Sequence, residues 1–448
     1  MTFIFEICLL IKLDIMFDLE KYNKKIEYIF KQVPSYQKVG RIAYKEGLNT
    51  MLLFDKKLGS PHKNFLTIHV AGTNGKGSVS HMLASVLMSC GVKVGLYTSP
   101  HLVDFRERIK VNGQMIPKED VLSFLDDNEE FVSSNKPSFF EITTAMAFDY
   151  FSKVGVEIAV IETGLGGRLD STNIVSPIIS VITNIALDHC DLLGYSISAI
   201  AKEKGGIIKN NIPVVVGEYS RSTRDIFETI ASEKGSLLIF SQESSYANVS
   251  LDDYELDLSG EYQVHNLRTV LTTLKILSRN PSFTKVVGDK WSDKNIREGL
   301  RTVIKQTGFR GRWEYLSVFP PVICDTGHNV NGLSYVFTQL RKQNFKRLFC
   351  IIGFVADKEI DKILGLLPQQ AYYLFTQASI ERALDAQELA QRCRVVGIEG
   401  EVCSTVDSAI ERFKAFYKEG DLLFIGGSNF IVGEAILFFE KNVNFFAN

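Results

Sequence analysis

The chain contains no C-x-x-C pair, and its seven cysteines are scattered along 448 residues. An odd, unpatterned set of cysteines is typical of a reducing compartment and argues against a structural zinc site. The formal net charge is only −2, whereas a general nucleic-acid binder needs clustered cations. Internal repeats and low-complexity tracts are also missing from the sequence. These features predict a cytoplasmic globular protein that has no nucleic-acid partner.

The first fifteen residues are apolar, but Glu6, Lys12 and Asp14 interrupt them. They lack a basic leading segment and a small-residue cleavage site, which argues against a secretory signal. The stretch is also too short and too charged to span a bilayer. A more natural start begins at Met16. We therefore expect residues 1–15 to be a non-native extension, and we expect no membrane partner.

One stretch combines an apolar run, a glycine-rich turn and a helix pattern. Residues 65–70 are apolar, residues 72–78 read Gly-Thr-Asn-Gly-Lys-Gly-Ser, and an amphipathic pattern begins at Val79. Glycines let backbone N–H groups approach a phosphate closely, and a helix start favours an anion. Lys76 adds a positive charge, and the Ser78 hydroxyl can reach Mg²⁺. The common phosphate loop has Ser or Thr directly after the lysine, where this chain has Gly77.

Apolar strand patterns alternate with helix patterns along most of the chain, which predicts largely parallel, doubly wound sheets. Strands are expected at residues 65–70, 92–97, 158–164, 177–183, 212–217, 322–324, 348–353, 372–376 and 422–426. Helices are expected within 17–58 and at 119–132, 141–153, 197–208, 266–277, 332–343, 358–367, 385–392, 406–418 and 430–440. Residues 236–262 are polar and broken, and we expect an antiparallel elaboration there.

The charged, turn-rich segment 305–312 predicts a boundary between two domains. The fold class is therefore α/β with two domains. Residues 16–308 are expected to form an N-terminal P-loop ATP-binding domain with a doubly wound sheet. Residues 313–448 are expected to form a C-terminal Rossmann-like α/β domain, which is long enough to have its own core.

Polar side chains stand where several predicted strands end. Ser99, Glu162 and His189 fall at the ends of three different predicted strands, and ligands of open α/β sheets bind at that edge. A hydroxyl, a carboxylate and a neutral imidazole near a triphosphate suit Mg²⁺, although imidazole is its less usual partner. Each residue also has an ordinary alternative: a turn before Pro100 for Ser99, a helix cap for Glu162, and a hydrogen-bonded core position for His189.

An ordered set of motifs resembles the folylpolyglutamate synthase/dihydrofolate synthase family, which belongs to the Mur-type ATP-dependent amide ligases. The motifs are HVAGTNGKGS at 69–78, YTSPHL at 97–102, ETGLGGRLD at 162–170, LDH at 187–189, EKGGIIK at 203–209 and DTGHN at 325–329. The resemblance runs from about residue 40 to the C-terminus. The ordered set is far more specific than a phosphate loop alone.

The resemblance implies an ATP site, metal sites and a modified lysine. It places Thr73, Asn74, Gly75, Lys76, Gly77 and Ser78 at the ATP phosphates, with Asn266 at the adenine, Arg312 at the phosphates and Asp325 at the ribose. It implies Mg²⁺ ligands at Ser99, Glu162 and His189, and two Mg²⁺ sites in all. It also implies that CO₂ carbamylates Lys204, which turns a cation into an anion near the second Mg²⁺. An ordinary solvated helix lysine is the alternative, and the family usually has Ala where this chain has Gly205.

The resemblance further implies where the other substrates bind. The pterin or folate is expected at Ser138, Phe139, Phe140, Glu141, Leu169, Asp170 and Ser171, because aromatic faces and a carboxylate suit a flat ring. At least one of the two phenylalanines is expected in the core. His328 and Ser428 are expected at the glutamate, although Ser428 could equally cap the next helix. Lys76, Lys204 and His328 are the expected catalytic residues.

The resemblance implies an ATP-dependent ligase that joins L-glutamate to dihydropteroate, reduced folates or both through an acyl phosphate. We expect a bifunctional, monomeric enzyme whose partners are small molecules. A monofunctional folylpolyglutamate synthase, another Mur-type ligase and a non-enzymatic nucleotide-binding module are the alternatives. Gly77 argues against other Mur-type ligases, and Glu162, His189 and Lys204 together argue against the non-enzymatic module.

Overall fold

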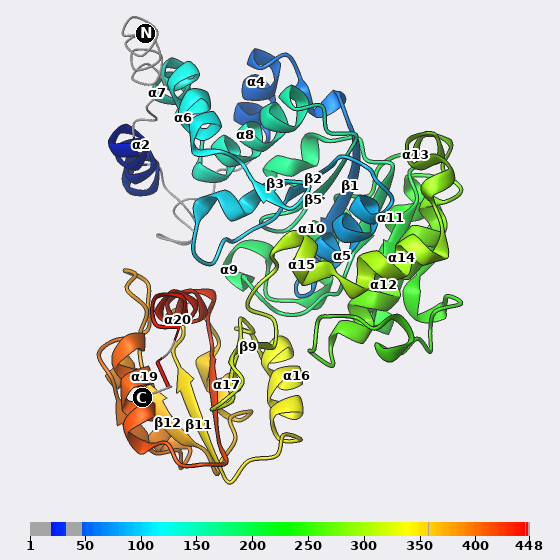
Figure 1. The fold of residues 1–448 in the computed structure, drawn as a ribbon. Coiled ribbons are helices and arrows are strands. Elements are labelled where there is room, and N and C mark those ends of the chain that lie inside the picture. The colour runs from blue at the N-terminus through cyan, green and yellow to red at the C-terminus, as the bar shows by residue number, and fades with distance from the viewer. Residues whose placement is uncertain (1–18, 33–46, 357, 444, 447–448) are drawn as a thin grey trace, which may run out of the picture.

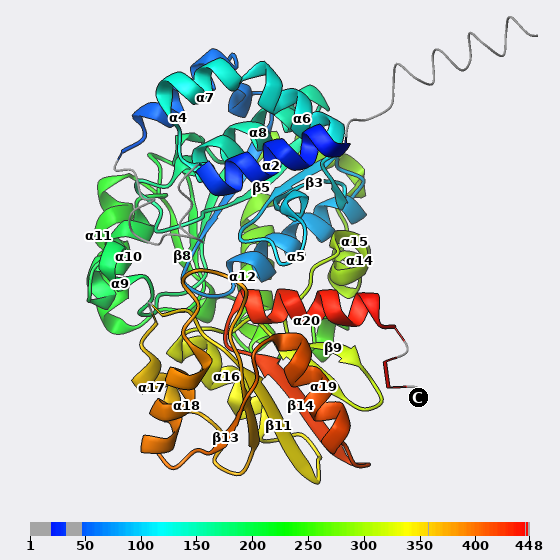
Figure 2. The same cartoon turned by 90° about the vertical axis from the view of Figure 1, so that its left-hand side faces the viewer.

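In the computed structural model, the described residues are 19–32, 47–356, 358–443 and 445–446. They form two α/β halves, each built on its own sheet, and the second half lies against one end of the first (Figure 1). Figure 2 shows the C-terminal helix α20 (Asn429–Lys441) lying where the two halves meet. The expected α/β fold with two domains is confirmed. The residue limits 16–308 and 313–448 stay predictions.

The first sheet has eight strands in the order β4-β3-β2-β5-β1-β6-β7-β8. The strands are β1 Leu66–Ala71, β2 Val94–Tyr97, β3 Ile109–Val111, β4 Gln114–Met115, β5 Ile158–Glu162, β6 Ile179–Ile182, β7 Val214–Val216 and β8 Leu238–Phe240. All neighbouring pairs from β2 to β8 are parallel, whereas β3 and β4 pair antiparallel at one edge. The strands around β1 therefore end at the same edge, where the predicted site lies.

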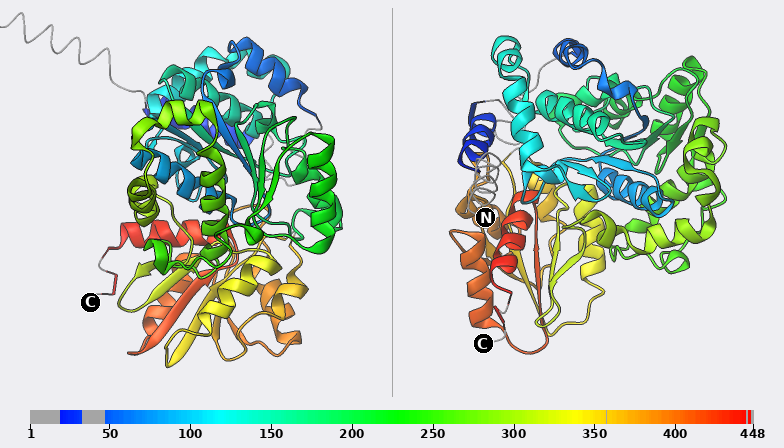
Figure 3. Two further views of the ribbon diagram at one scale, coloured as in Figure 1. Left: turned by 90° about the vertical axis from the view of Figure 1, so that its right-hand side faces the viewer. Right: turned by 45° about the horizontal axis from the view of Figure 1, so that its top comes forward.

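Helices cover both faces of the first sheet (Figures 1 and 3). Side chains of α5 (Lys76–Ser89), α12 (Gln263–Leu277), α13 (Pro281–Val287) and α14 (Asp293–Arg301) share one core with one face of the strands. The other face packs against α4 (Asn49–Lys57), α6 (Lys118–Asp127), α8 (Phe139–Lys153), α10 (Ile197–Gly205) and α11 (Arg221–Glu233). The remaining helices of this half are α2 (Leu19–Gln32), α7 (Glu129–Asn135), α9 (Cys190–Leu193) and α15 (Val303–Thr307).

The second sheet has six strands in the order β13-β12-β11-β14-β10-β9. The strands are β9 Glu314–Ser317, β10 Val322–Asp325, β11 Arg347–Ile352, β12 Tyr372–Phe375, β13 Gly400–Val402 and β14 Asp421–Gly426. The helices α16 (Val330–Leu340), α17 (Ile360–Leu364) and α18 (Ala386–Val395) pack on one face, while α19 (Val406–Phe416) and α20 pack on the other. Only β9 runs antiparallel to its neighbour.

One element prediction is wrong, and several short strands at the sheet edges were not predicted. Residues 236–262 contain no antiparallel elaboration: β8 extends the parallel sheet beside β7, and short 3₁₀ turns follow it. The antiparallel strands lie instead at the other edge, in β3 and β4. The short edge strands β9 and β13 were also missed, because β9 has only four residues and is partly exposed, and β13 has three residues and is largely exposed.

Helix α8 begins at Phe139, earlier than the apolar pattern predicts. The hydroxyl of Ser138 accepts a hydrogen bond from the N–H of Glu141, whose carboxylate accepts one from the N–H of Ser138. This reciprocal capping box fixes the start of the helix.

The predicted extension 1–15 lies outside the described residues. None of the helices in the described part of the chain has the length and apolarity needed to cross a membrane.

Candidate active site

The glycine-rich turn joins β1 to α5 and forms the floor of the site. Gly72 and Gly75 have φ angles of +151° and +83°, which side chains rarely adopt. A Cβ atom on Gly72 would lie 1.8 Å from the hydroxyl oxygen of Thr183, and one on Gly75 would lie 2.2 Å from Oδ1 of Asn266. The backbone of this loop is therefore packed from both sides, and its shape depends on glycine.

Replacing Gly72 with alanine should raise the KM for ATP about 10- to 100-fold, because the loop must shift to relieve the clash with Thr183. Steady-state kinetics measures the change. Gly155→Ala is the matched control, since Gly155 also has a positive φ of +70° but has no atom within 4 Å of an added Cβ. An unchanged ATP KM in the Gly72 variant would contradict this account of the loop.

A cleft of about 120 Å³ opens beside the loop and contains every residue predicted to bind ATP. These residues are Thr73, Asn74, Gly75, Lys76, Gly77, Ser78, Asn266, Arg312 and Asp325. The Lys76 ammonium lies 3.3 Å from the carbonyl oxygen of Thr73 and 4.0 Å from a carboxylate oxygen of Glu162. Arg312 comes from the segment before β9, so both halves of the chain line the cleft. Individual ATP contacts stay predictions.

Internal hydrogen bonds hold Asp325 and Asn266 of the predicted ATP set. Asp325 accepts hydrogen bonds from the Tyr262 hydroxyl at 2.6 Å and from the N–H groups of Trp313 at 2.8 Å and Gly327 at 2.7 Å. Asn266 donates to the side chain of Gln263 at 2.7 Å. Burial raises the pKa of Asp325, although Arg312 and the three groups that donate to Asp325 act in the opposite direction. The internal contacts hold both side chains in place at the wall of the cleft.

Ser99 lines both cavities around Lys76, whereas Glu162 lines the nucleotide cleft and His189 the other cavity; a shared metal site stays a prediction. The N–H of Ser99 donates to Oε2 of Glu162 at 3.2 Å. Burial raises the pKa of Glu162 to about 7, while Lys76 and Arg312 act in the opposite direction. Burial lowers the pKa of His189 to about 3, so its imidazole is neutral. A hydroxyl, a carboxylate and a neutral imidazole are chemically able to hold a divalent cation.

Lys204 is buried on α10 and is no solvated helix lysine. Its ammonium donates to the carbonyl oxygen of Gly72 at 2.7 Å, which places it against the phosphate loop. Burial and the nearby Lys76 lower the pKa of Lys204 to about 7. A large fraction of this amine is therefore neutral at physiological pH, and the neutral amine is the form that can react with CO₂. The neighbouring Gly205 packs against Ile230, where an added Cβ would lie 2.6 Å away.

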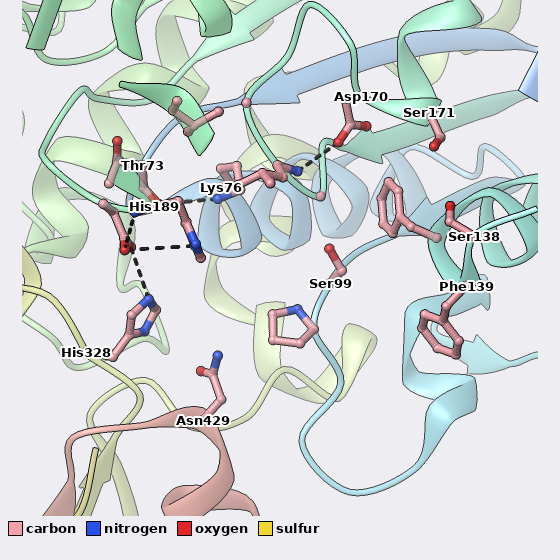
Figure 4. Close-up of a pocket in the computed structure, with 18 of the residues that line it drawn as sticks. Thr73, Lys76, Ser99, Ser138, Phe139, Asp170, Ser171, His189, His328 and Asn429 are labelled. Carbon is pink, nitrogen blue, oxygen red and sulfur yellow. Dashed lines mark hydrogen bonds and ion pairs between the residues drawn. The ribbon is translucent and has the colours of Figure 1, made fainter. Parts of the chain in front are cut away.

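A second cavity, of about 240 Å³, extends from Lys76 away from the nucleotide cleft. It contains every residue predicted to bind the pterin: Ser138, Phe139, Phe140, Glu141, Leu169, Asp170 and Ser171. In Figure 4, Ser138 and Phe139 lie across this cavity from His189 and His328. Of the two phenylalanines, Phe139 is the core residue. Its ring packs against Phe105 at 6.0 Å, and the Arg108 guanidinium lies 5.2 Å from the ring centre.

The predicted glutamate residues His328 and Ser428 lie on the wall that the second half contributes. The Ser428 hydroxyl accepts a hydrogen bond from the N–H of Ile431 at 3.2 Å, so it caps α20. His328 lies 3.3 Å from a carboxylate oxygen of Asp188. The predicted cap of Ser428 is thus confirmed, and a glutamate contact by either residue stays a prediction.

Comparison with known proteins identifies the family. The Mur ligase middle domain family matches residues 70–279, and the glutamate ligase domain of Mur ligases matches residues 311–429. A Bacillus subtilis dihydrofolate synthase/folylpolyglutamate synthase is 34% identical over 384 residues, covering 79% of this chain and 88% of the relative. The chain belongs to the folylpolyglutamate synthase/dihydrofolate synthase family.

Solved structures of this family have the same fold. E. coli FolC in complex with DHPP and ADP superposes with a TM-score of 0.81 at 28% identity, covering 94% of this chain and 98% of that one. A bifunctional folylpolyglutamate synthase/dihydrofolate synthase with Mn, AMPPNP and L-glutamate bound has a TM-score of 0.77 at 26% identity, with 93% and 97% covered. The chain spans only 50% of a longer Haloferax volcanii relative, a probable bifunctional folylpolyglutamate synthase/dihydropteroate synthase that is 29% identical.

In this member of the folylpolyglutamate synthase family, a charged cluster between the two halves was missed by the sequence reasoning. Asp188 from the loop after β6 forms an ion pair with Lys358 of the second half, and it accepts a hydrogen bond from Asn329 at 3.0 Å. Burial opposes ionisation of Asp188, but the Lys358 ammonium and a hydrogen bond from His328 outweigh it and hold the pKa of Asp188 well below the ordinary value. Asp188 directly precedes His189, and Lys358 follows the predicted strand 348–353, so position after a strand was the available signal.

Proposed function

We propose that this chain is an ATP-dependent ligase that joins L-glutamate to dihydropteroate and to reduced folates through an acyl phosphate. One observation carries the proposal: the nucleotide cleft and the larger cavity share Thr73, Lys76 and Ser99. A γ-phosphoryl group in the first and a carboxylate in the second would therefore meet beside Lys76. Membership of a family whose solved members hold ADP, AMPPNP, DHPP or L-glutamate supports this choice of substrates.

The reaction needs charge stabilisation, which the residues around Lys76 supply. Lys76 offsets the negative charge of the phosphoryl group as it passes to the substrate carboxylate. Ser99, Glu162 and His189 would hold a divalent cation, which neutralises phosphate charge and orients the oxygens. The amine of L-glutamate then attacks the acyl carbon, and phosphate leaves as the amide forms.

Carbamylation of Lys204 is part of the proposal. The neutral amine adds to CO₂ and releases a proton, which leaves an anionic carbamate at the phosphate loop. The change removes the repulsion between the cations of Lys204 and Lys76. It also adds oxygen ligands of the kind that a second Mg²⁺ prefers.

The two halves close the site together. Asp325 and His328 come from the second half, and Lys76 and Ser99 from the first. An acyl phosphate hydrolyses when water reaches it, so a closed arrangement protects the intermediate. We place the enzyme in the cytoplasm as a monomer that acts on small molecules.

Glutamate-dependent release of ADP from ATP tests the function. Purified protein with Mg²⁺ and bicarbonate is expected to release ADP only when L-glutamate and an acceptor are both present. Assays with dihydropteroate and with tetrahydrofolate, side by side, distinguish a bifunctional enzyme from a monofunctional folylpolyglutamate synthase. The Lys76→Met variant is the control for contaminating ATPases. Absence of glutamate-dependent release with both acceptors would refute the proposal.

A further inference from the structure

We propose that His69 and Thr172 are positioning residues, which act through Asp170 to fix the glycine-rich loop 164–171 at the acceptor end of the larger cavity. The three side chains form a buried hydrogen-bond chain between strand β1 and the 3₁₀ turn Ser171–Ile174. The inference rests on the proposed function, because it concerns how the acceptor is held.

The direction of the chain follows from the hydrogens that are present. Oγ1 of Thr172 lies 2.5 Å from Oδ1 of Asp170 and 2.8 Å from Nε2 of His69. A carboxylate only accepts, so the single hydroxyl hydrogen goes to Asp170 and the hydroxyl oxygen must accept from His69. The proton of the imidazole therefore lies on Nε2.

The state of His69 agrees with this direction. The residue is fully buried, and burial, assisted by Lys209, lowers its pKa to about 3. The ring is thus neutral and has a single N–H group. Among the described residues, Nδ1 of His69 has no hydrogen-bond partner. Leaving the buried acceptor Nδ1 without a partner costs free energy. The hydrogen bond that Nε2 donates to Thr172 gives a reason for a histidine at this position in spite of that cost.

Hydrogen bonds accepted by Asp170 hold the loop 164–171 in place. Oδ1 also accepts from the N–H of Thr172 at 3.0 Å, and Oδ2 accepts from the N–H of Leu165 at 2.8 Å. The backbone N–H of Gly164 also donates to this carboxylate, so donors of the protein fill its acceptor positions. Asp170 consequently connects both ends of the loop.

The glycine-rich loop 164–171 is closely packed, so its shape depends on the hydrogen bonds that Asp170 accepts. A Cβ on Gly164 would lie 2.5 Å from the ring of Phe140, and one on Gly167 would lie 2.8 Å from the carbonyl oxygen of Glu203. The loop is therefore held between the aromatic wall of the cavity and α10. Loss of the chain should disturb the acceptor site more than the nucleotide cleft, because His69, Asp170 and Thr172 do not line that cleft.

Thr172→Val tests the inference, since valine has the same shape and lacks the hydroxyl. The KM for dihydropteroate is expected to rise about 10-fold, as for a lost hydrogen bond to a charged group, while the KM for ATP changes less than about twofold. Thr172→Ser keeps the hydroxyl and should restore the acceptor KM. Equal acceptor KM values for the two variants, or equal increases in both KM values of Thr172→Val, would overturn the proposal.

A second pair of variants probes the other end of the chain. His69→Gln places an N–H near the position of Nε2, whereas His69→Leu has no donor. The acceptor KM should rise in His69→Leu and stay within about threefold of wild type in His69→Gln. Thermal unfolding of each variant shows whether the fold is intact, and this pair decides the matter if Thr172→Val fails to fold. Wild-type protein without glutamate-dependent ADP release would instead refute the proposed function.

Discussion

Replacing Lys204 with methionine should lower kcat/KM for the ligase reaction roughly 100- to 1,000-fold. Methionine preserves the buried apolar stem but cannot form a carbamate. The fold should survive, because a neutral side chain replaces an amine whose burial already disfavours its charge. Lys202→Met is the matched control, since Lys202 lies on the same helix and is exposed. Full activity in Lys204→Met would exclude the proposed role.

The dependence of ligase activity on CO₂ and pH is an independent test of Lys204 carbamylation. Burial lowers the pKa of Lys204 to about 7, so the ammonium form, which cannot add CO₂, dominates below that pH. Activity should therefore rise as the pH increases through about 7. Wild-type enzyme in CO₂-free buffer should lose activity and regain it when bicarbonate is added, while Lys204→Met should not respond. Equal rates of wild-type enzyme with and without bicarbonate would count against the carbamate.

Replacing Asp188 with asparagine should lower the free energy of unfolding by about 3 kcal/mol and reduce kcat at least 10-fold. Asparagine has nearly the same shape but leaves the Lys358 ammonium, whose side chain is 8% exposed, without its counter-charge. The hydrogen bond from Asn329 can persist. The substitution therefore removes mainly the ion pair between Asp188 and Lys358, which joins the two halves of the chain.

Urea unfolding and small-angle X-ray scattering measure the two consequences. The scattering of Asp188→Asn should show a larger radius of gyration, because an uncompensated buried cation favours separation of the halves. Asp191→Asn is the control, as Asp191 lies nearby on α9 and is exposed. A variant as stable, as compact and as active as wild type would show that this ion pair contributes little to domain closure.

Local patterns predicted the parts of this site that depend on neighbouring residues. The phosphate loop could be found because glycines, a lysine and a helix start follow one another within a few residues. Ser99 and Glu162 could be placed with it because parallel strands end at one edge of a sheet. The parallel central strands were likewise predicted from their apolar runs, whereas short edge strands such as β9, half-buried and antiparallel, carry too little pattern.

Contacts between distant segments could not be predicted in this way. Asp188 and Lys358 are 170 positions apart, and His69 and Thr172 are 103 positions apart. No spacing rule joins such residues. Strand order places β5 beside β1, far from it in the sequence, and Asp188 and Lys358 belong to different halves of the chain.

The sequence by itself therefore determined the family, the phosphate loop and the candidate residues, since these depend on local composition and motif order. Only the tertiary structure decided which faces are buried and which charges meet. It assigned Phe139 to the core, lowered the pKa of Lys204 through burial, and joined two cavities at Lys76. Burial and long-range pairing set these properties, and both arise only when segments far apart in the sequence pack together.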